Sequence, residues 1–243
     1  MTSTKTLQSA VLAVLCAISA LPAQATAIFD VATDFSIVGG NPNGAWSYGY
    51  STSLTSALLL HTQNETISGV DFWDTNLAVK VPAAFHNATS NVATLFTTVQ
   101  LQPGQFALHP GPNNEYAKAR LTVQTASDYS IMGAFSGADL WGTTTDAHIL
   151  LNGVSIFDGM VNGFGANTGP SFSLTKSLVV GDTLDFAVGF GSNGSYYNDS
   201  TALSAQITAV PEPETYALML AGLSGLGLVR FAARNKQYGN LPT

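Results

Sequence analysis

Hydrophobic and polar side chains alternate one by one through the middle of this chain. Leu184, Phe186 and Val188, for example, alternate with Thr183 and Asp185. Successive side chains of a strand point to opposite faces, so a period of two predicts half-buried antiparallel strands. Outside the two ends of the chain, no amphipathic helical segment of useful length interrupts the pattern.

Asn152-Gly153 lies between two apolar runs, which is the strongest short-range signal for a β-hairpin. The other predicted strands are short and separated by turn residues. They cover residues 28–37, 46–50, 55–61, 68–72, 94–100, 105–108, 117–123, 129–135, 171–178, 181–190 and 203–209. Many short strands of this kind predict an all-β protein with a single jelly-roll-like antiparallel β-sandwich.

The N-terminus has the features of an export signal. Lys5 precedes an apolar stretch at residues 7–21, and two A-x-A sites follow at residues 23–27. This order predicts a secretory signal peptide over residues 1–27, with a signal helix too short to span a bilayer. Cys16 is the only cysteine and lies inside this signal, so we expect a secreted domain with neither disulfides nor a cysteine metal site.

The C-terminus joins a proline motif, an apolar run and a basic end. The run predicts a hydrophobic helix over residues 215–233. Its core, residues 216–229, rises only about 21 Å against roughly 30 Å of hydrocarbon, a marginal transmembrane helix. The motif and basic residues are Pro211, Glu212, Pro213, Arg230, Arg234 and Lys236. This three-part tail resembles the PEP-CTERM sorting signal of Gram-negative, polysaccharide-secreting bacteria, which also ends some ice-binding proteins.

The resemblance concerns sorting and implies no catalytic residues. It implies that residues 211–243 are a sorting tail recognised, and cleaved near Pro-Glu-Pro, by an exosortase-type membrane enzyme. The expected partners are therefore the export machinery and that enzyme, with transient insertion into the inner membrane. The expected destination is the cell surface or extracellular matrix. Residues 28–210 remain as the β-sandwich domain.

The charge of this domain excludes one class of partner. Residues 28–210 hold four basic and thirteen acidic side chains, a net charge of −9. Such a domain has too few cations to neutralise phosphates, so we expect no nucleic-acid binding. Ser, Thr, Asn and Gly take the place of charges on the surface, a composition that suits an outer matrix protein.

Enzyme signatures are missing from the sequence. Residues 189–194 match G-x-G-x-x-G, but no βαβ unit surrounds them, so a glycine-rich loop between strands explains them better. The sequence lacks a G-x-S-x-G elbow, an H-E-x-x-H motif and a P-loop. We therefore expect no enzyme, although a pair of carboxylates for glycan hydrolysis needs no local spacing and stays an alternative.

Two aromatic segments carry the candidate binding chemistry. Aromatic faces beside short amide and carboxylate groups are typical of sugar-binding surfaces. Asn198 and Asp199 would also suit Ca²⁺, or simply an Asx-rich turn, and no other cofactor is expected. The four histidines show no zinc-type spacing, so the metal ligands are unknown. The predicted site residues are Trp141, Tyr196, Tyr197, Asn198 and Asp199.

The body also has a resemblance of its own. Residues 41–50, 108–112, 144–153 and 181–186 resemble segments of uncharacterised secreted bacterial β-sandwich modules, which are similar to carbohydrate-binding jelly rolls. We therefore expect an exported, surface-sorted, non-catalytic protein that associates with extracellular polysaccharide. The alternatives are a structural matrix or adhesion protein without a discrete ligand site, ice binding, and glycan hydrolysis.

Overall fold

The computed structural model describes residues 27–75, 79–210, 219–227 and 230. Ala27–Ala209 form one compact unit. The predicted signal helix lies outside the described residues. So do most of the sorting residues, namely Pro211, Glu212, Pro213, Arg234 and Lys236.

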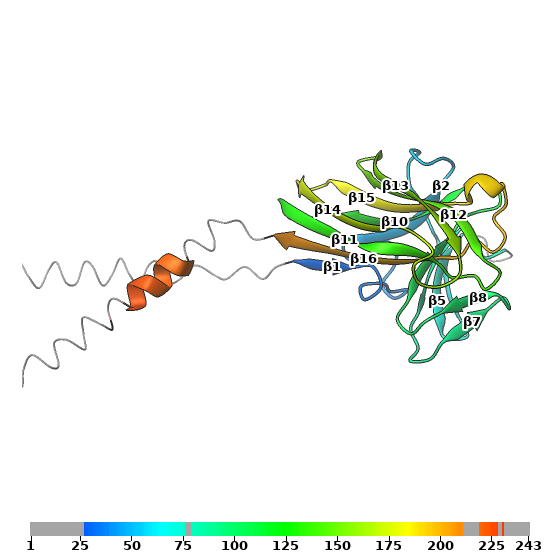
Figure 1. The fold of residues 1–243 in the computed structure, drawn as a ribbon, viewed down its shortest axis with the longest axis horizontal. Helices are drawn as coiled ribbons and strands as arrows, with labels where there is room; N and C mark the ends of the chain where they lie inside the picture. Colours follow the sequence, from blue (N-terminus) through cyan, green and yellow to red (C-terminus); the bar gives the residue numbers. More distant parts are fainter. Residues whose placement is uncertain (1–26, 76–78, 211–218, 228–229, 231–243) are drawn as a thin grey trace, which may run out of the picture. The chain divides into compact units, whose positions relative to one another are not determined.

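The compact unit is a sandwich of two antiparallel sheets (Figure 1). In spatial order the first sheet holds β14 (Ser171–Leu178), β11 (Ser127–Gly137), β16 (Thr201–Val210), β9 (Phe106–His109), β6 (Ala83–Asn87), β5 (Val70–Asp74) and β4 (Gln63–Ile67), and β1 (Ile28–Asp30) also pairs with β16. The second sheet holds β13 (Val154–Gly163), β12 (Thr143–Leu151), β15 (Thr183–Gly189), β10 (Tyr116–Thr122), β2 (Trp46–Ser51) and β3 (Leu59–Leu60).

The chain crosses repeatedly between the two sheets. From β9 to β12 each strand lies in the sheet opposite to its predecessor. After the β12–β13 hairpin the alternation resumes and continues to β16. Such crossings are typical of jelly rolls. The predicted all-β, jelly-roll-like sandwich is therefore confirmed.

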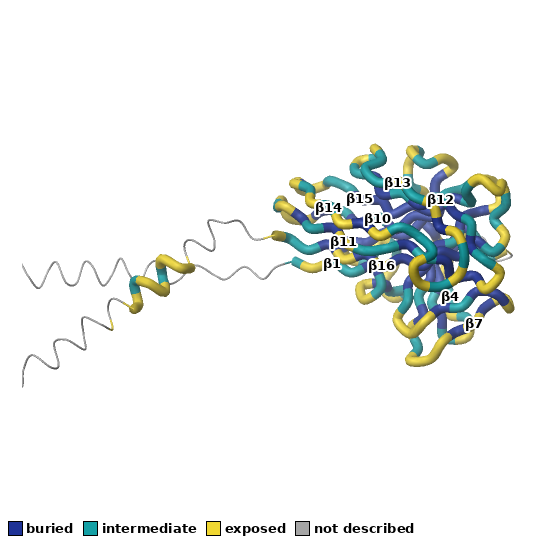
Figure 2. Tube along the Cα trace, viewed as in Figure 1, coloured by how far each residue is buried: buried dark blue, intermediate teal, exposed yellow. Residues whose placement is uncertain are grey.

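The main core lies between the two sheets, where buried segments meet (Figure 2). Ala119 of β10 is in register with Tyr48 of β2 and with Phe186 of β15, and all three are buried. Phe172 from the first sheet packs against Phe186, with ring centroids 5.8 Å apart. The alternation seen in the sequence therefore corresponds to one face of each strand turned into this core.

A second core lies on the outer face of the first sheet. The two-stranded hairpin β7 (Ala93–Leu95) and β8 (Val99–Leu101) covers β5, β6 and β9. Beneath it the rings of Phe72 and Phe85 stack with centroids 4.9 Å apart. This layer was not predicted. It matters because the candidate site opens at its edge.

Two predicted strands are wrong. Of residues 28–37, only Ile28–Asp30 is a strand, because the Asp30 carboxylate accepts hydrogen bonds from the N–H groups of Ala32 and Thr33 and turns the chain. Residues 94–100 form the β7–β8 hairpin and not one strand. Phe96 and Thr97 take positive φ angles of 49° and 68° there, which an extended strand does not allow.

Other predictions met with mixed outcomes. The Asn152-Gly153 hairpin is confirmed, with both residues at positive φ as its tight turn requires. The segment 55–61 keeps only the two residues of β3. β4 and β6 were not predicted. β4 is an edge strand of sequence QNETI, which lacks a clear apolar alternation.

The tail is described only in part. Residues 219–227 and residue 230 are helical, within the predicted helix 215–233. Met219, Leu220, Leu223 and Leu226 of this helix are exposed. Within the described part of the chain, no helix is both long and apolar enough to cross a membrane.

Candidate functional site

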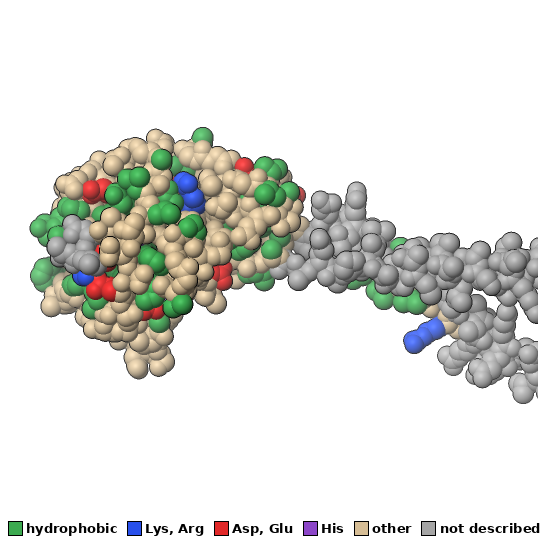
Figure 3. Space-filling view, turned by 180° about the vertical axis from the view of Figure 1, so that it is seen from behind, with side chains coloured by type: hydrophobic (Ala, Val, Ile, Leu, Met, Phe, Trp, Pro, Cys, Tyr) green, Lys and Arg blue, Asp and Glu red, His purple; other side chains and the backbone are tan. Residues whose placement is uncertain are grey.

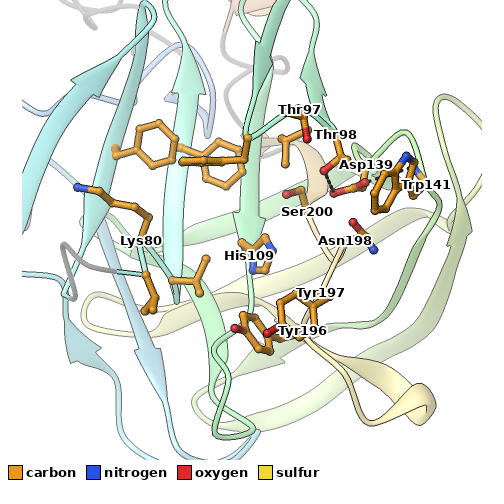
Figure 4. A pocket seen from close by; sticks show the side chains of 16 residues that line it. Lys80, Thr97, Thr98, His109, Asp139, Trp141, Tyr196, Tyr197, Asn198 and Ser200 are labelled. Carbon is orange, nitrogen blue, oxygen red and sulfur yellow. Dashed lines mark hydrogen bonds between the residues drawn. The ribbon is translucent and has the colours of Figure 1, made fainter.

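A half-open hollow of about 350 Å³ lies at the edge of the second core (Figure 4). Strands β5, β6 and β9 of the first sheet contribute to its lining, together with four connecting segments. These segments are the tip of the β7–β8 hairpin, residues 79–81 before β6, the turn before β12 and the loop before β16. The lining residues are Phe72, Val79, Lys80, Val81, Phe85, Phe96, Thr97, Thr98, Val99, His109, Asp139, Trp141, Tyr196, Tyr197, Asn198 and Ser200.

The turn before β12 presents Trp141 at the rim. Asp139, only 1% exposed, accepts hydrogen bonds from the Trp141 N–H at 3.2 Å and from the Thr98 hydroxyl at 3.2 Å. Burial raises the pKa of this carboxyl, and these two hydrogen bonds work against that rise. The Trp141 side chain itself is 78% exposed. The turn therefore holds a large aromatic face in solvent, as a sugar platform requires.

The loop before β16 supplies a second aromatic wall. The rings of Tyr196 and Tyr197 lie 4.4 Å apart, and Tyr196 also meets His109 edge-on at 6.3 Å. Tyr197 is 68% exposed. Asn198 follows with a positive φ of 65° and also lines the pocket, where Figure 4 shows its side chain between Trp141 and the two tyrosines.

Neutral polar groups form part of the pocket wall. The Pro110 carbonyl can only accept, so His109 must carry its proton on Nδ1, which lies 2.8 Å away, and Nε2 is left as an acceptor. Burial lowers the pKa of His109 to about 4, so the ring is uncharged at neutral pH. Among the described residues, the buried Ser200 hydroxyl finds no hydrogen-bond partner. His109 Nε2 is therefore an acceptor available to a polar ligand, whereas the Ser200 hydroxyl is buried out of a ligand's reach.

Asp199 does not line the pocket, contrary to its prediction as a ligand contact. Its side chain is 0% exposed, and its Oδ1 accepts hydrogen bonds from the N–H of Thr144 at 3.1 Å and from the Thr144 hydroxyl at 3.3 Å. Burial raises the pKa of Asp199 to about 7, although the Thr144 hydrogen bonds lower it. The residue anchors the loop from inside, so its contribution to the site is structural.

The Ca²⁺ alternative finds no cluster to support it. Within the described ranges, no group of three or more His, Cys, Asp or Glu side chains is placed to hold a metal ion. Asn198 points into the pocket region, whereas Asp199 is turned toward Thr144. The two predicted Ca²⁺ ligands therefore do not point toward one common site.

The glycine-rich segment 189–194 serves as the start of this aromatic loop. It contains the short 3-10 helix η1 (Gly191–Asn193) and no βαβ unit, in line with the loop interpretation. The N–H of Gly191 donates to Asp146 Oδ1 at 2.9 Å, and the Asn193 amide donates to the Thr144 hydroxyl. A side chain at Gly191 would place its Cβ 2.7 Å from the Thr144 carbonyl, so only glycine fits.

His148 supports this attachment from the outer face of the second sheet. Its Nε2 lies 2.8 Å from Asp146 and its Nδ1 lies 2.5 Å from Asp158. Burial works to lower the pKa of His148, but the bonds to the two carboxylates outweigh it and raise the pKa. Tyr116 also donates to Asp146 at 3.0 Å. The cluster therefore fixes Asp146, which in turn holds Gly191.

Four of the five predicted site residues meet around one pocket: Trp141, Tyr196, Tyr197 and Asn198. That they bind a ligand stays a prediction. Sequence reasoning missed Phe72, Phe96 and Lys80, because only the fold brings strand β5, the β7–β8 hairpin and the segment before β6 together. No local motif marks them.

Comparison with known proteins bears first on the tail. Residues 209–236 match the model of the PEP-CTERM protein-sorting motif. The chain carries a PEP-CTERM sorting signal. That signal marks an exported protein, sorted to the cell surface and processed by an exosortase-type enzyme. No curated protein matches the chain in sequence.

Solved structures resemble the body only distantly. A family 35 carbohydrate-binding module from Clostridium thermocellum is 11% identical with a TM-score of 0.32, covering 49% of this chain and 87% of the module. CBM35 from Cellvibrio japonicus Abf62 gives 8% identity, a TM-score of 0.31 and coverages of 53% and 93%. Pika GITRL is 13% identical with a TM-score of 0.26, covering 39% of this chain and 74% of GITRL. Such low scores carry no argument about a ligand, which has to come from the pocket itself.

Proposed function

We propose that the exported body is a non-catalytic glycan-binding domain of the cell envelope or extracellular polysaccharide matrix. The observation that carries this proposal is the convergence of Trp141 with Tyr196 and Tyr197 on one hollow. Sugar rings present apolar faces that stack on aromatic side chains, and their hydroxyls need fixed polar partners at the edges.

The polar groups of the pocket suit hydroxyl ligands. His109 Nε2 can accept a hydrogen bond. The Asn198 amide can both donate and accept. A sugar hydroxyl is likewise donor and acceptor, so it can pair with either of the two.

The pocket offers little for catalysis. Among its described lining residues Asp139 is the one carboxylate, and it is buried and bonded to Thr98 and to the Trp141 N–H. Glycoside hydrolysis commonly uses two carboxylates flanking the scissile bond. These features favour binding without turnover.

Co-sedimentation of the full-length protein with a panel of insoluble polysaccharides, followed by a glycan array, tests the proposal. We expect binding to at least one polysaccharide without release of sugar. Trp141→Ala and Tyr197→Ala should each weaken it about tenfold, as truncation of an aromatic side chain that the ligand covers commonly does. Phe164→Ala is the matched control, because Phe164 is partly exposed but does not line the pocket.

A structural matrix protein without a ligand site would behave differently. Ligand that binds only the folded state raises the melting temperature by mass action. We expect such a rise with the bound polysaccharide for the wild type and for Phe164→Ala. No binding by the wild type to any polysaccharide would sink the proposal and leave the structural role.

A further inference from the structure

One carboxyl group forms part of the pocket wall. Asp139 lines the pocket, is 1% exposed and accepts hydrogen bonds from the Thr98 hydroxyl and from the Trp141 N–H. Among the described lining residues it is the one acidic side chain, since Asp199 is turned toward Thr144. Negative charge placed in the pocket would therefore face the Asp139 carboxyl group, which is shielded from water.

Among the described residues that line the pocket, no free cation balances Asp139. Lys80 is the single basic side chain among the described residues that line the pocket, and it is ion-paired with Glu65 of β4. The His109 ring donates its Nδ1 hydrogen to the Pro110 carbonyl and offers only an acceptor nitrogen to a ligand. An acceptor nitrogen repels an anion, whereas it can accept a hydrogen bond from a hydroxyl group.

The whole domain adds a field of the same sign. Its net charge of −9 repels polyanions at long range, and Figure 3 shows one face where uncharged side chains and backbone dominate over scattered charges. Salt screens this long-range part over about 8 Å at physiological ionic strength, whereas buried charges are screened much less.

We infer that the pocket selects neutral glycans and rejects polysaccharides that carry carboxylate groups. The inference rests on the proposed function and names the ligand class of the same site. A carboxylate on the ligand would lose its water against Asp139 without gaining a free cationic partner, and an unpaired buried charge is costly. A hydroxyl at the same position carries no charge for Asp139 to repel, and Asn198 and His109 can pair with it.

The test compares neutral with carboxylate-bearing polysaccharides on the full-length protein. Dextran, amylose and a galactomannan form the neutral arm, and alginate and polygalacturonate form the acidic arm. Affinity is measured by biolayer interferometry at low and at physiological ionic strength. We expect the best neutral polymer to bind at least about tenfold tighter than either acidic one, as electrostatic discrimination allows. This difference in affinity should become smaller as the salt concentration rises, but it should not disappear.

Two variants separate the pocket from the overall charge. Glu65→Gln removes the carboxylate bonded to Lys80, so affinity for the acidic polymers should rise severalfold while neutral binding stays within about twofold. Asp128→Asn removes the same charge from an exposed position of β11 and should change neither.

The outcomes are distinguishable. Acidic polymers that bind as tightly as neutral ones would overturn the inference and leave the glycan-binding proposal standing. An equal gain of acidic binding in Asp128→Asn and Glu65→Gln would assign discrimination to net charge and overturn the role of the pocket. Absence of binding to every polymer would overturn both.

Discussion

The N–H of Thr144 donates to the Asp199 carboxylate over 3.1 Å and thereby ties the aromatic loop to the start of β12. At its other end the same loop is held by Gly191 on Asp146. Two residues of one strand thus fix both ends of the segment that carries Tyr196 and Tyr197. The pocket wall is built from the inside by carboxylates that no ligand needs to touch.

The buried state of Asp199 should make stability depend on pH. Its pKa of about 7 in the fold exceeds the ordinary value near 3.9, so the folded state holds a proton that the unfolded state has lost between these values. The stability linked to Asp199 is therefore fully present below about pH 4. It falls as pH rises to about 7, by up to about 1.4 kcal/mol per pH unit.

Asp199→Asn should remove this dependence, because the amide keeps the acceptor for Thr144 and cannot ionise. Urea unfolding of the wild type and the variant from pH 4 to 8 checks it. We expect the variant to gain stability relative to the wild type as pH rises. A difference between them that stays constant with pH would contradict the assignment.

His148 should control the anchoring of Gly191 through the positive charge of its protonated ring. Asp146 and Asp158 can both accept from its ring only when both nitrogens are protonated. Because the pKa of His148 is raised, its contribution is complete below about pH 6.5 and is lost as pH rises through the folded value. The exchange protection of the Gly191 amide should fall over that range.

His148→Gln should abolish this pH step in the Gly191 protection factor. The backbone N–H of Asn152 donates to the Thr183 carbonyl at the distant hairpin and is the internal control. Its protection factor should show no pH step in either protein. If the Gly191 protection factor had the same pH profile in the wild type and the variant, His148 would not control the anchoring of the loop.

Phe85 should carry both stability and the shape of the pocket. It stacks on Phe72 in the second core and also lines the hollow. Phe85→Ala should lower the free energy of unfolding by about 3–5 kcal/mol, since a large buried ring leaves a cavity. Denaturant unfolding measures this, with the exposed Val180→Ala as a control expected within about 0.5 kcal/mol of the wild type.

How far the sequence could predict this molecule depends on which contacts are local. The alternation at Leu184, Phe186 and Val188 faces the main core and so carries its own signal. The turn at Asn152-Gly153 is chemically local as well. The second core is different, because β5, β6 and β9 are covered on both faces and their pattern loses its period of two.

The candidate site divides in the same way. Trp141 and the two tyrosines could be predicted because each lies within a few residues of Asn or Asp in a predicted loop, so the signal is local. The role of Asp199 could not, since its partner Thr144 lies 55 residues away. Phe96 joins the pocket only because the chain turns back at Phe96 and Thr97, where non-glycine residues adopt positive φ against their usual preference.

Trp141 gives the most direct test of the central claim that this pocket binds a glycan. The chain has three tryptophans, and Trp46 and Trp73 are buried whereas Trp141 is exposed at the pocket rim. Acrylamide quenching of tryptophan fluorescence therefore reports mainly on Trp141, and Trp141→Phe supplies the background. We predict that a saturating neutral polysaccharide shields Trp141, so that quenching of the wild type falls toward the level of Trp141→Phe. Quenching that stays unchanged while polysaccharide is bound would show that the glycan sits elsewhere and would contradict the account.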